Sequence, residues 1–245
     1  MTRTDIDHYD GLEFWGPYDA AMLDPLVGAI EVPEDARALD IGCGDGALLR
    51  KLALEHGALV LGVDRSEAAL ALARHAFAQE GLQDRCAWFA QEASGFELAP
   101  ASLDIAAWLG GPFVGDSHAS TMRAFGSWVK PGGWLLLGQG FWATPPPAPY
   151  LEATGLPADT LEDEASMLAH AEAAGFTIVE RAPSSRAAWD HFESTIQANH
   201  EAYAAAHPND AAVQAMLATK RAWMDAQERW GRDAMGFAVY LLRRT

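Results

Sequence analysis

Residues 37–137 alternate between short apolar segments and longer amphipathic ones, and this alternation restricts the fold more than any other feature. Short apolar runs bounded by turn residues are typical of buried strands, and the segments between them have the length and apolar spacing of helices. Strands that alternate with helices in this way form parallel βαβ units. We therefore expect an α/β protein with a Rossmann-like, doubly wound and mostly parallel sheet.

The same pattern, followed to the end of the chain, predicts a seven-stranded sheet with a helical insertion before the last strand. The strands are predicted at 37–41, 58–63, 85–89, 103–108, 134–137, 176–181 and 236–242. Helices are predicted at 18–30, 47–56, 66–80 and 116–129, from Asp159 or Thr160 to Gly175, and as a pair within 184–231 that is divided at 207–209. Pro25 should perturb the first helix or divide it into two short pieces.

The chain of 245 residues is strongly acidic, with a formal net charge of −17. This charge repels phosphate backbones and anionic lipid surfaces, so we expect neither a nucleic acid nor a membrane as partner. No apolar run approaches the roughly 20 residues of a membrane span. Residues 1–10 are polar and acidic and predict no signal peptide, so we expect a cytoplasmic protein. Its two cysteines, Cys43 and Cys86, lie far apart, and we expect neither a disulfide nor a metal site.

A glycine-rich run, residues 39–46 with the sequence LDIGCGDG, joins the first predicted strand to the first helix. Glycines let the backbone turn sharply and let a ligand approach without meeting a Cβ atom. Ligands of open α/β sheets bind beyond the carboxyl ends of the strands, where this run lies. A glycine loop alone is weak support for a ligand site, because similar loops occur without ligands.

Acidic residues follow the next two predicted strands. Asp64 ends the second strand, where a carboxylate can accept hydrogen bonds from ribose hydroxyls; it could instead simply open the turn before the next helix. Glu92 and Ala93 follow the third strand, where a carboxylate can accept a hydrogen bond from an exocyclic amine such as that of adenine. These features at the ends of three successive strands favour a nucleoside-containing ligand.

These motifs resemble, in order and spacing, those of the class I S-adenosylmethionine (SAM)-dependent methyltransferases of the bacterial small-molecule type. The matching residues are 40–46 (DIGCGDG), 62–64 (GVD), 92–93 (EA), 103–105 (LDI) and 129–133 (VKPGG), within a stretch that covers roughly residues 30–140. Residues 230–233 (WGRD) and 236–240 (GFAVY) also resemble bacterial members of this superfamily. The residues after the fourth strand do not form the tetrad of amino-methylating DNA enzymes, and the extra cysteines of arsenite methyltransferases are absent from the sequence.

The resemblance implies a cofactor, SAM, with S-adenosyl-L-homocysteine (SAH) as product, and a set of residues that bind it. In that family the glycine loop holds the methionine part, the acid after the second strand holds the ribose and the acid after the third faces the adenine. The family more often has Asp where this chain has Glu92. We therefore expect the cofactor to contact Asp40, Gly42, Cys43, Gly44, Asp64, Arg65, Glu92, Ala93, Trp108 and Trp15, with Cys43 contributing only backbone groups.

The resemblance also implies a single methyltransferase domain over residues 1–245. Residues 1–32 would form an N-terminal helix and lid, 33–182 the SAM-binding core, 183–235 the helical insertion and 236–245 the last strand. Residues 5–18 are rich in aromatic side chains, and Trp142, Trp189, Trp223 and Trp230 also lie in segments that could close over the ligand. We expect the insertion and the aromatic segment to form a mobile lid, although core packing is the favoured interpretation of each single tryptophan.

The chemistry implied is an in-line displacement that transfers a methyl group to a small molecule. The sequence identifies no general base. His118 follows the fourth strand, but we expect a solvated histidine at the start of a helix, and the same interpretation applies to His191 and His200. Two other functions remain open: an NAD(P)-dependent oxidoreductase, which shares the glycine loop, and a SAM-binding protein without transferase activity. The acceptor and the oligomeric state are not predicted.

Overall fold

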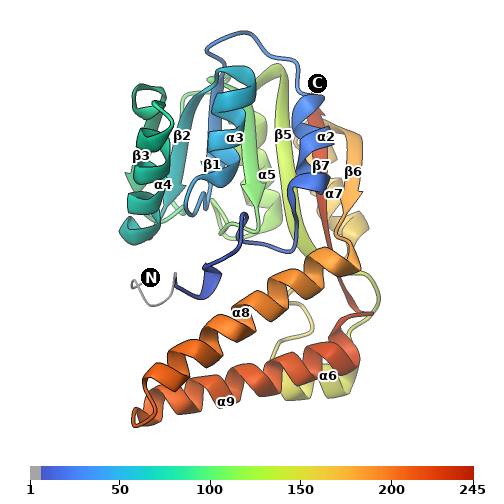
Figure 1. The fold of residues 1–245 in the computed structure, drawn as a ribbon. Helices are drawn as coiled ribbons and strands as arrows, with labels where there is room; N and C mark the ends of the chain where they lie inside the picture. Colours follow the sequence, from blue (N-terminus) through green and yellow to red (C-terminus); the bar gives the residue numbers. More distant parts are fainter. Residues whose placement is uncertain (1–6) are drawn as a thin grey trace.

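The computed structural model describes residues 7–245 and contains a seven-stranded sheet (Figure 1). The strand order is β3-β2-β1-β4-β5-β7-β6. The strands are β1 (Arg37–Ile41), β2 (Leu59–Asp64), β3 (Cys86–Ala90), β4 (Leu103–Leu109), β5 (Val129–Trp142), β6 (Phe176–Pro183) and β7 (Met235–Arg244). The pairs from β3 to β5 are parallel, whereas β7 is antiparallel to both of its neighbours. The predicted Rossmann-like, mostly parallel sheet is confirmed.

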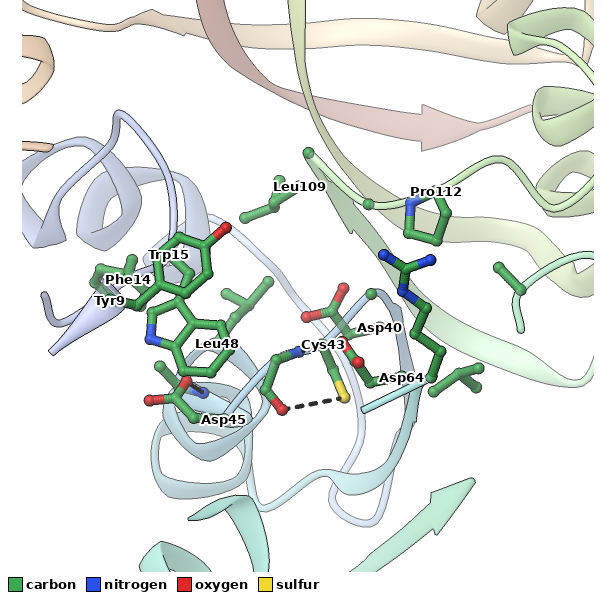
Figure 2. Close-up of a pocket in the computed structure, with 18 of the residues that line it drawn as sticks. Tyr9, Phe14, Trp15, Asp40, Cys43, Asp45, Leu48, Asp64, Leu109 and Pro112 are labelled. Atoms are coloured by element: carbon green, nitrogen blue, oxygen red, sulfur yellow. Dashed lines mark hydrogen bonds between the residues drawn. The ribbon is translucent and has the colours of Figure 1, made fainter. Parts of the chain in front are cut away.

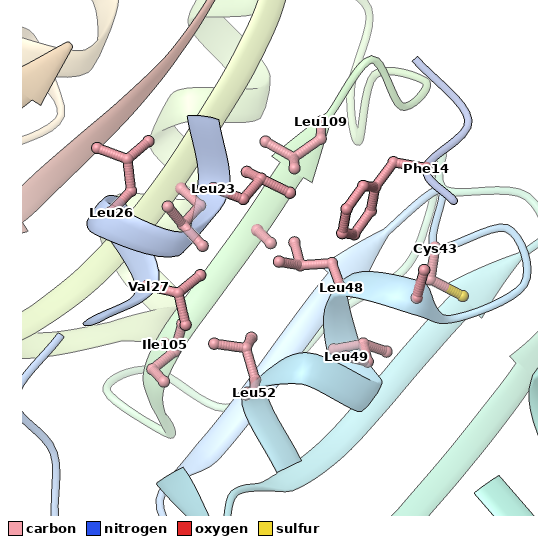
Figure 3. Close-up of a cluster of buried hydrophobic side chains, with 14 of the residues drawn as sticks. Phe14, Leu23, Leu26, Val27, Cys43, Leu48, Leu49, Leu52, Ile105 and Leu109 are labelled. Carbon is pink, nitrogen blue, oxygen red and sulfur yellow. The ribbon is translucent and has the colours of Figure 1, made fainter. Parts of the chain in front are cut away.

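Helices cover both faces of this sheet. One face carries α2 (Ala20–Gly28), α3 (Ala47–His56) and α4 (Glu67–Gln79), and the other carries α5 (His118–Trp128) and α7 (Glu164–Ala173). Figure 3 shows the apolar side chains of α2 and α3 in one cluster with Ile105 and Leu109 of β4. Because side chains alternate along a strand, Trp108 and Leu109 at the end of β4 belong to the cores on opposite faces. This alternation decides which side chains reach a site at the strand ends.

Capping residues fix several of the predicted helix boundaries. The Ser66 Oγ accepts a hydrogen bond from the Ala69 backbone N–H at 3.2 Å and begins α4. Gly57 has a φ of +62° and ends α3 in the left-handed conformation that favours glycine. Both boundaries agree with the sequence prediction.

The predicted division of the first helix at Pro25 is wrong, because α2 is one helix with Pro25 inside it. Leu23, Leu26 and Val27 of this helix are buried against the sheet, and this packing offsets the backbone hydrogen bond that a proline cannot donate. The start of α7 also differs: Asp163, rather than Asp159 or Thr160, caps it by accepting a hydrogen bond from the Ser166 N–H at 2.8 Å.

The connection between β5 and α7 is more structured than the sequence predicts. β5 continues to Trp142 because β7 pairs with it along its whole second half. A short helix, α6 (Ala148–Thr154), follows the cluster of prolines, with Pro147 at its N-cap. A proline is tolerated there because the first turn of a helix has no partner for its backbone N–H.

The predicted insertion is a pair of antiparallel helices between β6 and β7, α8 (Arg186–Ala206) and α9 (Ala211–Ala226), followed by the π-helical turn η3 (Gln227–Gly231). We call α8, α9 and η3 the helical arm; in Figure 1 it projects beyond one end of the sheet. The N-terminal turn η1 (Asp7–Tyr9) packs against α8. The Asn199 side-chain amide donates hydrogen bonds to the backbone carbonyls of His8 and Asp10, at 3.0 and 2.8 Å. The expectations for residues 1–6 lie outside the described residues.

Two further findings concern the whole of the described chain. Within residues 7–245, none of the helices combines the length and apolar character needed to cross a bilayer. The same residues contain no group of three or more His, Cys, Asp or Glu side chains placed to hold a metal ion.

Candidate active site

A pocket of about 310 Å³ lies at the carboxyl ends of β1, β2 and β4. All the predicted cofactor-binding residues except Trp108 line it: Trp15, Asp40, Gly42, Cys43, Gly44, Asp64, Arg65, Glu92 and Ala93. Figure 2 shows the aromatic side chains of Tyr9, Phe14 and Trp15 on one side of this pocket and Asp40 and Asp64 on the other. The topology thus brings together residues that are far apart in the sequence.

The glycine loop forms the floor of the pocket in a conformation that requires glycine. Gly42, Gly44 and Gly46 have φ angles of +77°, +54° and +75°. A Cβ atom on Gly44 would lie 2.9 Å from the Trp15 ring, and one on Gly42 would lie 2.8 Å from the Gly111 backbone. The backbone N–H groups of Gly42 and Cys43 both donate to the Val63 carbonyl, at 2.8 and 3.1 Å. The loop is therefore held against β2 and leaves its other side open to a ligand.

Asp64 is tied to this loop through both of its carboxylate oxygens. Its Oδ2 accepts a hydrogen bond from the Gly44 N–H at 3.0 Å, and its Oδ1 accepts one from the Ser66 N–H at 2.8 Å. The side chain therefore has a fixed direction at the end of β2. Each carboxylate oxygen can still accept a further hydrogen bond from a ligand hydroxyl.

Asp40 is the buried acid of the pocket, with 5% of the residue exposed. Its Oδ1 has no hydrogen-bond partner among the described residues. Burial, together with the nearby carboxylate of Asp64, raises the pKa of Asp40 well above its ordinary value. A cationic or hydrogen-bond-donating group of a ligand would supply the partner that this oxygen lacks.

Cys43 and the residues at the rim have simpler environments. The Cys43 thiol is buried, and burial raises its pKa well above the ordinary value, so it remains a neutral thiol. Arg65 and Glu92 lie at the exposed rim, where Arg65 Nη1 and Glu92 Oε1 are 3.9 Å apart. An exposed pair at this distance contributes little stability, so the Glu92 carboxylate can turn toward a ligand at small cost.

Aromatic residues of the N-terminal segment cover the pocket. The Tyr9 ring stacks on the Trp15 ring, with centroids 4.6 Å apart and planes at 9°. Burial and the charge of Asp64 raise the pKa of Tyr9, and burial raises that of Tyr18. Sequence reasoning did not assign Tyr9 or Tyr18 to the cofactor site, although both line the pocket. Their clustering before the first strand is the feature that identifies them.

Trp108 does not belong to the pocket, and this prediction is corrected. It is fully buried on the α5 face of the sheet, and its Nε1 donates a hydrogen bond to the Gly111 carbonyl at 2.8 Å. The following residue, Leu109, faces the pocket instead. From the α5 face of the sheet, the Trp108 side chain supports the loop after β4, and it has no direct access to a ligand in the pocket.

The expectation of a solvated His118 is also wrong. Its ring lies 5.4 Å from that of Trp108 and 5.0 Å from that of Phe113, and only 6% of the residue is exposed. Burial lowers the pKa of His118, against the opposing effect of Glu162, whose Oε1 lies 3.7 Å from the Nδ1. His118 is absent from the pocket lining, as are His191 and His200 of the arm.

Taken together, these groups fit SAM. The glycine loop lets a ligand approach the backbone closely, and the Oδ1 of the buried Asp40 lacks a hydrogen-bond donor. The Asp64 carboxylate is fixed at the end of β2, and the exposed Glu92 carboxylate can turn toward a ligand. Aromatic rings face this acidic floor and would favour a cationic group such as a sulfonium. The arrangement can bind a nucleoside-containing cation and shield it from water.

Comparisons of sequence agree with this site. Residues 38–133 match a family model described as a methyltransferase domain. The uncharacterized protein YjhP of Escherichia coli (strain K12) is 22% identical over 228 residues, which cover 92% of each chain. A ubiquinone biosynthesis O-methyltransferase of Stutzerimonas stutzeri (strain A1501) is 37% identical over 97 residues, which cover 40% of this chain and 41% of that enzyme. The chain thus matches less than half of that enzyme's length.

Solved structures share the fold over the full chain. A SAM-dependent methyltransferase from Geobacter sulfurreducens, in complex with SAH, has a TM-score of 0.87 at 23% identity and covers 100% of this chain and 99% of its own. The E. coli YjhP structure has a TM-score of 0.85 at 22% identity, with 100% of both chains covered. Residues 38–133 therefore match a methyltransferase domain, and the whole chain has the fold of SAM-dependent methyltransferases of known structure.

Proposed function

We propose that this enzyme transfers the methyl group of SAM to a small-molecule acceptor by in-line displacement. The observation that carries the proposal is the pocket at the carboxyl end of the sheet, where the glycine loop and two acids lie beneath an aromatic cover. Bound SAM supplies an activated methyl group, so the protein needs mainly to align the reactants and exclude water. The covering rings of Tyr9 and Trp15 perform the second task.

We assign the following roles to the residues of the pocket. Gly42, Cys43 and Gly44 present their backbone to the methionine part of SAM, and the unpartnered oxygen of Asp40 accepts a hydrogen bond from its amino group. Asp64 holds the ribose, while Glu92 and Ala93 face the adenine, with Arg65 at the rim beside them. Trp15 lies over the loop and faces the positive sulfonium. Trp108 does not contact SAM, because it lies in the core.

A small-molecule acceptor is supported by charge and by relatives. The net charge of −17 disfavours a nucleic-acid acceptor. The partly matching relative is, by its name, an O-methyltransferase of ubiquinone biosynthesis, which is a small-molecule pathway. The remaining alternative is a protein that binds SAM without transferring its methyl group. The oxidoreductase alternative is set aside because the matching domain is a methyltransferase domain.

Two measurements, made one after the other, test the proposal. Calorimetry should show SAH binding to the wild-type protein, and much weaker binding to Asp40→Ala, with Asp104→Ala, which changes an acid outside the pocket, as the matched control. SAH release from methyl-labelled SAM should then be followed in the presence of a panel of amines, phenols and carbon acids. Failure to bind SAH would refute the whole proposal, whereas binding without acceptor-dependent SAH release across the panel would favour the SAM-binding alternative.

A further inference from the structure

One side-chain amide of the helical arm holds the backbone on both sides of Tyr9. The Asn199 Nδ2 donates a hydrogen bond to the His8 carbonyl at 3.0 Å and another to the Asp10 carbonyl at 2.8 Å. Carbonyls at the end of a helical turn have no partner within that turn, so donors from another element stabilise them. An amide has two N–H donors and can serve both carbonyls. A residue of α8 thus fixes the backbone around a residue that lines the SAM pocket.

Tyr9 connects this anchor to the glycine loop. Its ring stacks on the Trp15 ring, with centroids 4.6 Å apart. The Trp15 ring in turn lies against Gly44, where an added Cβ atom would be 2.9 Å from it. Figure 2 shows both rings on one side of the pocket. Contacts therefore run from Asn199 through two aromatic rings to the loop that lines the SAM pocket.

Two neighbours of Asn199 on α8 lie beside the same N-terminal segment. An added Cβ atom on Gly11 would be 3.9 Å from the Cγ2 of Thr195, which lies about one helical turn before Asn199. The ring of His200 has its centroid 5.4 Å from that of His8. One face of α8 therefore packs against η1 and the residues after it, and Figure 1 shows the two elements side by side.

A further hydrogen bond attaches this segment to the start of the arm. We call residues 8–18 the cover segment. The Ser184 Oγ, two residues before α8, donates to the Pro17 carbonyl. The side chains of Phe14 and Trp15, which line the pocket, lie in the sequence between this attachment and the one made by Asn199. The cover segment is therefore attached to the arm near each of its ends.

A matched amide elsewhere in the arm provides a comparison. Asn199 is half-buried and does not line the SAM pocket, so its effect on a ligand must pass through the cover segment. Gln214 of α9 also donates from its side-chain amide to two carbonyls, those of Ala204 and His207, at 2.9 and 3.2 Å. These carbonyls belong to the turn between α8 and α9. The two amides make the same kind of contact, but that of Gln214 is made within the arm.

We propose that Asn199 is a positioning residue for the cofactor: its two hydrogen bonds keep the Tyr9 ring on Trp15 and the cover segment closed over bound SAM or SAH. The inference rests on the proposed SAM site and adds the residue that controls the exchange of its ligand. Without these bonds the cover segment opens more often, so SAH leaves the pocket faster. The affinity changes less than the release rate, because an open cover also admits the ligand faster.

The test measures the release rate by chasing labelled SAH from the loaded protein with an excess of unlabelled SAH. Asn199→Ala should release SAH at least about fivefold faster than the wild type, because two hydrogen bonds that hold the closed cover are lost. Asn199→Asp keeps the size of the side chain but turns a carboxylate toward two carbonyl oxygens, so it should release SAH at least as fast as Asn199→Ala. Gln214→Ala should stay within about twofold of the wild type, because its lost bonds lie within the arm.

A double-mutant cycle separates positioning from a general loss of stability. In urea denaturation, Asn199→Ala and Gln214→Ala should lose similar stability, because each loses the two hydrogen bonds of an amide. In Tyr9→Ala the stacked ring is absent, so adding Asn199→Ala should change the release rate by less than about twofold. The effect of Asn199 on release thus depends on the Tyr9 ring, whereas its effect on stability does not distinguish it from Gln214.

Three results would overturn the inference while leaving the SAM site in place. They are release from Asn199→Ala within about twofold of the wild type, equal acceleration by Gln214→Ala, and an undiminished effect of Asn199→Ala in the Tyr9→Ala background. Failure of the wild type to bind SAH would instead refute the proposed function.

Discussion

The close approach of the Trp15 ring to Gly44 allows a quantitative test of the conformation of the glycine loop. Gly44 has a φ of +54°, and a Cβ atom added there would lie 2.9 Å from Trp15 Cε3. Gly44→Ala should therefore destabilise the protein in two ways. The left-handed backbone costs an L-residue about 1–2 kcal/mol, and overpacking against a ring adds about 1–3 kcal/mol.

Gly81→Ala is the matched control for this change. Gly81 has a φ of +71°, similar to that of Gly44, but a Cβ atom there would meet nothing within 4 Å. The free energy of unfolding, measured by urea denaturation, should fall by about 1–2 kcal/mol in Gly81→Ala and by about 2–5 kcal/mol in Gly44→Ala. Calorimetry should show SAH binding at least about tenfold weaker in Gly44→Ala, a change of about 1.4 kcal/mol, and unchanged in Gly81→Ala.

The double variant Gly44→Ala/Trp15→Ala isolates the contact. Removing the ring should recover the overpacking part of the loss, so the two substitutions should be non-additive by about 1–3 kcal/mol. If Gly44→Ala and Gly81→Ala destabilise the protein equally and the double variant is additive, Trp15 does not lie on Gly44. The aromatic cover over the SAM pocket would then be wrongly described.

Four further predictions follow from the site. Asp64→Ala should weaken SAH binding by about 1.5–3 kcal/mol in calorimetry, because a charged hydrogen bond to the ribose is lost; unchanged affinity would leave Asp64 only its role in holding the loop. Because the pKa of Asp40 is raised in the folded protein, the folded state binds its proton more tightly, and stability falls as pH rises from about 4 through the folded pKa. In urea denaturation, the stability of Asp40→Asn relative to the wild type should therefore increase as the pH rises above about 4; a constant difference would contradict the burial of that carboxylate. Trp108→Phe should lower the free energy of unfolding by about 1–3 kcal/mol without changing SAH affinity, since this ring packs in the core. Hydrogen exchange should show SAH-dependent protection at 8–20 and 185–205 if these segments close as a lid; protection limited to the glycine loop would make them static packing.

The central part of the fold could be predicted because its elements are short and locally specified. The run at 39–46 specifies a strand, a turn and a helix within a few residues, and the structure reproduces them with Gly46 at the N-cap of α3. Asp64, Glu92 and Ala93 were located by the same reasoning, because the carboxyl ends of parallel strands meet at one edge of a sheet.

The errors arise where contacts between distant residues decide the outcome. Trp108 and Leu109 both end β4, and only the packing of α5 on one face shows that Trp108 points away from the pocket. His118 is buried against the rings of Trp108 and Phe113, and Glu162, far along the chain, lies 3.7 Å from its Nδ1. The backbone of Trp142 donates to the Glu162 carbonyl at 2.9 Å, and this pairing positions Asp163, rather than Asp159, to begin α7. None of these pairings leaves a pattern in the local sequence.

The position of β7 has a consequence for how the molecule is made. β6 hydrogen-bonds to β7 and lies at the edge of the sheet, while β7 itself lies between β5 and β6. Because residues 235–244 are synthesised after β6 and the whole helical arm, β6 has no neighbouring strand while the arm emerges from the ribosome. One edge of β5 and one edge of β6 therefore remain unpaired in the nascent chain until β7 is inserted between them. Such edges can pair with another chain, so production of this enzyme should depend more on chaperones than a fold completed in sequence order would.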